Sequence, residues 1–187
     1  MKDIKSNVEH SVSKQPVRRI KQRGVTAIEA IAVIFVGVVT LAVAAAVIDR
    51  LFSNADVSEE TSNINSLALS TKGLKTVSGY GPANTNLVPQ LVTTKGIPQN
   101  MTVTGGIIYN TWGGVVTVVS NGPNFDIGYG GVPQDACVTL AAKVNKGAFS
   151  TVRVNSATGV TGEYTSQQAS SDCSDPLTNS VSWTSKR

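Results

Sequence analysis

Hydrophobic and polar positions divide the chain into three zones. Residues 1–24 are polar and basic, residues 25–52 are mostly apolar, and residues 53–187 are rich in Gly, Thr, Ser and Asn. Residues 30–48 carry no charged side chain. As a helix rising about 1.5 Å per residue, this stretch would cover about 28 Å, close to the roughly 30 Å hydrocarbon core of a bilayer. The pattern therefore predicts a transmembrane helix within residues 25–52.

The helix is predicted to continue beyond the apolar zone. One buried face is indicated by four positions spaced i, i+3, i+4 and i+7, namely Ile64, Leu67, Ala68 and Thr71. Gly73 and Gly79 then act as stop signals. A helix from residue 25 to about residue 71 or 74 would be roughly 70 to 75 Å long. Its first half is apolar all round and its second half is amphipathic.

The third zone predicts a single α+β domain over residues 53–187, a usual domain size. Runs of β-branched and aromatic residues predict strands at residues 101–103, 106–109, 115–119, 125–129, 149–154 and 181–184. Helical spacing predicts a short helix over residues 135–144 and one turn near residues 87–92. We expect an α+β fold in which the long N-terminal helix packs on an antiparallel β-sheet.

The net charge of +4 comes from the first zone. Residues 1–24 hold seven basic and two acidic side chains, a net charge of +5, so the remainder carries −1. A basic chain can bind nucleic acid through its phosphates, but a basic flank beside an apolar helix is typical of a cytoplasmic membrane end. We therefore expect no nucleic-acid partner, and we expect the C-terminal part to lie across the membrane.

Residue types that support catalysis are sparse. The only histidine, His10, lies in the basic zone, so the chain after residue 24 has no imidazole for a catalytic triad or a metal site. Asp126, Asp172 and Asp175 are too scattered in the sequence to indicate a metal site. We expect a protein that is not an enzyme and uses no metal or other cofactor.

Two cysteines, Cys137 and Cys173, lie in the polar C-terminal part. The expected topology places them in a compartment that permits disulfides, so one bridge between them is the natural interpretation. Two unpaired thiols in a cytosolic fold are the alternative.

Glu29 is the only charged residue between Arg23 and Asp49, and it stands five residues after Gly24. Residues 21–29, Lys-Gln-Arg-Gly-Val-Thr-Ala-Ile-Glu, resemble the processing site of a type IV prepilin, where a charged leader ends in Gly before an apolar helix with a Glu near its start. Many type IV pilins begin with Phe, whereas this chain would begin with Val25. That residue, the long leader and the two-cysteine C-terminal half resemble the type IVb branch.

The resemblance implies that residues 1–24 are a leader cut off after Gly24, where a residue without a side chain lets the backbone approach the peptidase closely. It implies an N-methylated Val25 and a filament-assembly role for Glu29, whose carboxylate would neutralise the Val25 amine of an adjacent subunit. An acid in a membrane helix costs a few kcal/mol and usually marks function. The plainer interpretation is a carboxylate stabilised at a helix start by about 0.3 to 1 kcal/mol.

The implied function is that of a structural subunit that polymerises through residues 25–52 into an extracellular type IVb pilus, for adhesion, aggregation or conjugative mating contact. The implied partners are further copies of the chain, a prepilin peptidase, an inner-membrane assembly platform and its cytoplasmic ATPase. Before assembly, the subunit would cross the inner membrane once, with its N-terminus in the cytoplasm.

Two alternatives use the same sequence differently. A pseudopilin of a type II secretion system shares the N-terminal features, although its globular domain is commonly smaller. A membrane-anchored or secreted binding domain would follow if a conventional signal peptidase cut at the small-residue sites of residues 42–44 or 44–46.

Overall fold

The computed structural model describes residues 27–144 and 147–187. Its first element, α1 (Ala27–Lys72), ends directly before Gly73, as the stop signal predicts. α1 crosses the boundary between two compact units, Met1–Ala44 and Ala45–Arg187. Six side chains are described in the first part of this helix: Ile28, Ile31, Ala32, Ile34, Phe35 and Val38. Over the described residues, no helix combines the length and apolarity needed to cross a membrane.

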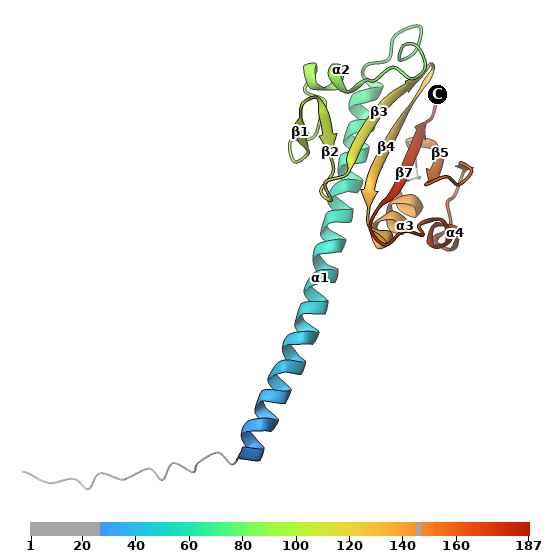
Figure 1. Ribbon diagram of the computed structural model, residues 1–187. Helices are drawn as coiled ribbons and strands as arrows, with labels where there is room; N and C mark the ends of the chain where they lie inside the picture. Colours follow the sequence, from blue (N-terminus) through green and yellow to red (C-terminus); the bar gives the residue numbers. More distant parts are fainter. Residues whose placement is uncertain (1–26, 145–146) are drawn as a thin grey trace, which may run out of the picture. The chain divides into compact units, whose positions relative to one another are not determined.

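Seven strands form one antiparallel sheet in the second unit. They are β1 (Thr102–Thr104), β2 (Ile107–Tyr109), β3 (Val115–Asn121), β4 (Asn124–Val132), β5 (Phe149–Val154), β6 (Val160–Thr161) and β7 (Asn179–Ser185). Their order across the sheet is β1-β2-β3-β4-β7-β5-β6, so the last strand of the chain lies between β4 and β5 (Figure 1). The antiparallel sheet is confirmed. The two-residue β6 was not predicted, because it is too short to show an alternating pattern.

Three short helices complete the second unit: α2 (Val88–Thr93), α3 (Gln134–Lys143) and α4 (Ser166–Asp172). α2 and α3 lie within a residue of their predicted positions. α4 was not predicted, although its start carries a capping box. In that box Gln168 N–H donates to Thr165 Oγ1 at 3.2 Å, and Thr165 N–H donates to Gln168 Oε1 at 3.3 Å.

The hydrophobic core lies between the inner face of the sheet and the helices that cover it. Strand residues alternate between buried and more exposed positions, as in β3 and β7. The largest buried ring is that of Trp183 in β7, which packs edge-on against Tyr129 with ring centroids 5.7 Å apart. Phe149 lies on its other side at 6.3 Å. The second unit therefore has a core of its own.

Candidate assembly surface and its anchor

The predicted processing site, Gly24 and Val25, lies outside the described residues. Glu29 lies in the first turn of α1, and its side chain is also outside the description. Within the predicted assembly segment, residues 25–52, the side chains that the structure describes are those of Ile28, Ile31, Ala32, Ile34, Phe35 and Val38.

Large apolar side chains are exposed in this first part of α1. Their exposed fractions run from 80% for Ile28 to 60% for Val38, and the set, here called the apolar stripe, is Ile28, Ile31, Ile34, Phe35 and Val38. At about 100° per residue, these five described side chains lie within roughly 120° of one another, on a segment whose sequence is apolar all round. A contiguous exposed apolar surface marks contact with another protein or with lipid. The apolar stripe is thus a surface suited to be covered.

The second part of α1 is anchored to the sheet by apolar contacts. All four residues of the predicted buried face are at most 1% exposed, and Val57 joins the same core. This confirms the amphipathic face. Each large aliphatic side chain that is fully buried contributes about 1.5 to 3 kcal/mol, so these contacts fix the helix to the sheet.

A buried carboxylate adds a polar anchor that the sequence reasoning missed. Glu60 is 1% exposed. Its Oε1 accepts from the Thr111 backbone N–H at 2.6 Å, and its Oε2 accepts from the Tyr129 hydroxyl and from Asn63 Nδ2, both at 3.1 Å. Burial, followed by the charge and hydrogen bond of Glu60, raises the pKa of Tyr129 well above its ordinary value. One side chain therefore ties α1 to β4 and to the β2–β3 turn.

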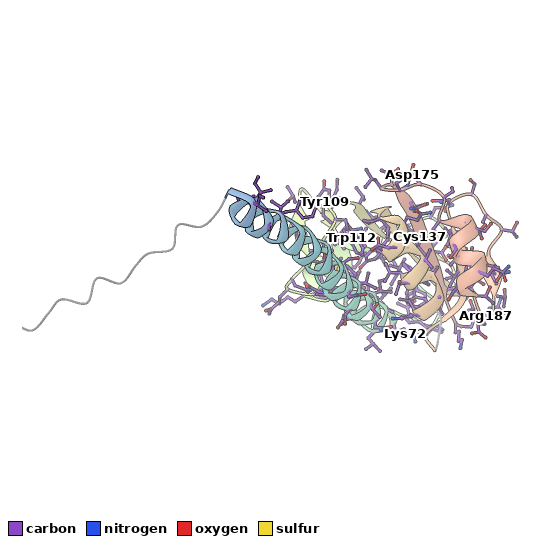
Figure 2. All side chains as sticks on the ribbon, turned by 90° about the horizontal axis from the view of Figure 1, so that it is seen from below. Lys72, Tyr109, Trp112, Cys137, Asp175 and Arg187 are labelled. Atoms are coloured by element: carbon purple, nitrogen blue, oxygen red, sulfur yellow. A yellow bond between two sulfur atoms is a disulfide. The ribbon has the colours of Figure 1, made fainter. Side chains whose placement is uncertain are left out.

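The β2–β3 turn that Glu60 reaches is built around Asn110, in the region of Tyr109 and Trp112 marked in Figure 2. Asn110 Nδ2 donates to the Gly130 carbonyl at 2.9 Å, and its Oδ1 accepts from the Gly114 N–H at 2.8 Å. A Cβ at Gly114 would lie 1.8 Å from the Gly130 carbonyl oxygen, so this close approach requires glycine. The turn presents the Thr111 N–H to Glu60 in a fixed position.

Cys137 of α3, labelled in Figure 2, and Cys173, at the end of α4, form a disulfide, as the sequence predicts. Both cysteines are fully buried. Gln134 Nε2 also donates to the Cys173 carbonyl at 2.8 Å, and the Tyr164 hydroxyl donates to the Asp172 carboxylate. The disulfide and the Gln134 contact hold α3 and α4 together, and α3 packs beside β7 and β5.

Metal chemistry has no site in the part of the chain that the structure describes. Within it, no three His, Cys, Asp or Glu side chains lie close enough together to hold an ion. The described residues instead form an exposed apolar helix surface, a buried anchor between α1 and the sheet, and a domain tied by a disulfide. These are features of a subunit that packs against other molecules.

Comparison with known proteins agrees with that description. Residues 54–186 match the family described as PilS N terminal. The fold matches the crystal structure of TcpA, a type IV pilin from Vibrio cholerae El Tor biotype, with a TM-score of 0.52 and 14% identity, over 71% of this chain and 99% of that one. No curated protein matches significantly. The chain belongs to the PilS N-terminal family and has the fold of a type IV pilin, a structural subunit of a pilus and not an enzyme.

Proposed function

We propose that this chain is the subunit of a type IVb pilus in which residues 25–52 first anchor the subunit in the inner membrane and then pack in the filament core. The observation that carries the proposal is the apolar stripe, five large side chains that are 60 to 80% exposed on a helix whose later part buries one apolar face, that of Val57, Ile64, Leu67 and Ala68. Lipid before assembly and neighbouring helices afterwards are two environments that would cover it.

The sequence supports a processing step that precedes assembly. Residues 1–24 form the leader, a prepilin peptidase cuts after Gly24, and the new Val25 amine is methylated. An inner-membrane platform driven by a cytoplasmic ATPase then moves the subunit into the filament. Residues 53–187 remain outside the filament core, where they serve adhesion, aggregation or conjugative mating contact.

Glu29 joins one subunit to the next in this proposal. Its carboxylate pairs with the Val25 ammonium of a neighbouring copy, which removes two charges from an apolar core at once. Loss of one partner from a buried pair typically costs about 3 to 5 kcal/mol. Such a cost at every subunit would prevent filament growth.

The test separates processing from assembly with two variants in a strain that lacks the wild-type subunit. Gly24→Leu should block the cut and leave the full-length precursor, because the leucine side chain keeps the backbone from the peptidase. Glu29→Ala should be cut normally but form no filaments, because Gly24 and the apolar segment are unchanged. Intact-mass measurement reports the cut and the methyl group, and sheared filaments report assembly.

Two outcomes would contradict the proposal. Mature protein of unchanged mass from Gly24→Leu would move the cut elsewhere, for example to residues 42–44 or 44–46. Normal filament yield from Glu29→Ala would remove the pairing mechanism. Glu29→Asp is the matched control, because it keeps the charge and should retain more assembly than Glu29→Ala does.

A further inference from the structure

The outer face of the sheet, opposite the core, carries a polar cleft. Alternation along the strands places Asp126 of β4 and both Ser182 and Thr184 of β7 on this face. Asp126 lies opposite Thr184 in the register of β4 and β7. On the other side of β7, Thr184 lies opposite Thr151 and Ser182 opposite Arg153 of β5. The hydroxyls of β7 therefore form a floor, with an acid on one flanking strand and a base on the other.

The two charges of the cleft do not neutralise each other. β4 and β5 are separated by β7, so their backbones lie about 10 Å apart, which is two strand spacings. Within residues 27–144 and 147–187, neither the Asp126 carboxylate nor the Arg153 guanidinium has a hydrogen-bond or ion-pair partner. Arg153 is exposed and Asp126 is half-buried, and both residues line the cleft.

Unsatisfied acceptors make the acidic side of the cleft unusual. Asp126 Oδ1 and, beyond the lining of the cleft on the same face of β4, Asn124 Oδ1 are both covered from solvent and lack a donor among the described residues. A buried acceptor without a donor is destabilising, because it has lost its hydrogen bonds to water. The other oxygen, Asp126 Oδ2, is not covered and is the one that a ligand in the cleft meets.

The cleft has room for such a ligand. Its volume is about 420 Å³, within the range of small-molecule sites. Gly128 of β4 lies opposite Ser182 and places no side chain in the cleft. A Cβ at this position would lie 2.6 Å from Thr117 Oγ1. The lining is mainly hydroxyl, amide and charged groups.

We propose that this cleft binds a saccharide. Each sugar hydroxyl both donates and accepts, so one pyranose can donate to the Asp126 carboxylate and accept from Arg153 and from the hydroxyls of β7. An apolar ligand would leave all of these groups unpaired. A divalent cation would meet a single carboxylate with an arginine across the cleft, which is a poor set of ligands for a hard ion.

The experiment uses the full chain, purified in a detergent whose headgroup contains no sugar, and saturation-transfer NMR. The probes are glucose, galactose, mannose, N-acetylglucosamine and glucuronic acid, with a lysine–glutamate dipeptide as the zwitterionic comparison. At least one sugar should bind saturably, with a Kd of about 1 mM or below. The measurement needs no filament, so failure of sugar binding and failure of pilus assembly are distinguishable.

Four variants locate the binding. Asp126→Asn and Arg153→Gln should each weaken the sugar by about tenfold or more, because each removes a charge-assisted hydrogen bond. Gly128→Ala should weaken it without changing any charge, because the added methyl raises the floor. Asp56→Asn, an acid on α1 outside the cleft, should leave binding unchanged. Arg153 is exposed, so its variant keeps the fold, which circular dichroism verifies.

Each of the opposite results overturns the proposal. The cleft is not a saccharide site if none of the five sugars binds saturably, or if binding is equal in Asp126→Asn, Arg153→Gln and the wild type. Binding of the dipeptide alone would identify a peptide site. A change only in self-association of the Asp126 and Arg153 variants would identify a contact between copies of the chain.

Discussion

The two parts of α1 place the same kind of side chain in opposite environments. Ile28 is 80% exposed, whereas Ile64 is fully buried against the sheet. Burying one large aliphatic side chain stabilises a protein by about 1.5 to 3 kcal/mol. The exposed side chains of the apolar stripe do not contribute this stabilisation. In the later part of the helix, Ile64 and Leu67 contribute it through burial within one chain. In the proposed function, lipid or further copies of the chain would cover the first part, whereas the apolar face of the later part is buried within the second unit.

Carboxylates show the same division. Glu60 is buried, and three donors from its own chain satisfy it. Glu29 is proposed to find its donor on another copy. In one region the fold supplies the partner of a buried acid, and in the other region assembly would supply it. The variants below ask whether each region depends on the partners assigned to it, starting with the largest expected effect.

Matched isoleucine variants give the sharpest contrast. Ile64→Ala should lower the free energy of unfolding of the globular unit by about 4 kcal/mol, because it leaves a cavity between α1 and the sheet. Ile31→Ala should change it by less than about 0.5 kcal/mol, since Ile31 is 66% exposed. Denaturant unfolding of the two full-length variants measures both values. Equal losses would mean that the stripe is also covered within the monomer.

The disulfide should contribute slightly less than the buried isoleucine. It closes a loop with a sequence separation of 36, and replacing both Cys137 and Cys173 by Ala should cost about 3 to 4 kcal/mol in the chain-entropy model. The loss belongs to the second unit, so membrane insertion of the double variant should remain normal. Urea midpoints of the oxidised wild type and the double variant test this. An unchanged midpoint would contradict the assigned role.

Glu60→Gln tests the polar anchor with little change in volume. The amide keeps one acceptor but puts an NH2 group where Glu60 now accepts from Tyr129 and Asn63, so we expect a loss of about 2 kcal/mol. Glu59→Gln is the neighbouring control, because Glu59 is exposed and bonds only Asn100 within the described residues. Thermal unfolding compares the two. If Glu59→Gln costs as much as Glu60→Gln, burial of the carboxylate is not what matters.

Local patterns predicted much of this fold. Ile64, Leu67, Ala68 and Thr71 are all buried, because helix periodicity depends on neighbours in the sequence. The cysteine pair was also predictable, since the chain offers one combination. The insertion of β7 between β4 and β5 was not, because strand order depends on pairing between distant segments.

The anchor was harder to predict than the helix that carries it. Glu60 falls on the same helical stripe as Ile64 and Leu67, and that spacing was a usable signal for burial. Its partner Tyr129 is 69 residues away and gives no local sign of the contact. Gly24, Val25 and Glu29 remain sequence predictions. Their proposed chemistry involves a peptidase and a second subunit, which no pattern within one folded chain can specify.

Alkaline pH should weaken the contact between Tyr129 and Glu60. Of the effects predicted here, this decrease in the free energy of unfolding should be the smallest and the most gradual. The pKa of Tyr129 is raised above 10.0 by burial and then by Glu60, so the folded state holds this proton more tightly than the unfolded state does. The stabilisation is therefore fully present below pH 10.0 and declines as the pH rises above it. Burial also raises the pKa of Tyr80 and Tyr164, so part of the decline belongs to them.

Tyr129→Phe should separate the contribution of this residue. The variant loses about 1 kcal/mol near neutral pH through the missing hydrogen bond to Glu60, and its free energy of unfolding should then fall less steeply than that of the wild type between about pH 9 and 11. Tyr109→Phe, at the rim of the β2–β3 turn, should keep the wild-type slope. Parallel curves for Tyr129→Phe and the wild type would show that the buried Tyr129–Glu60 contact does not control alkaline stability. The difference between α1's two parts would then rest on apolar burial alone.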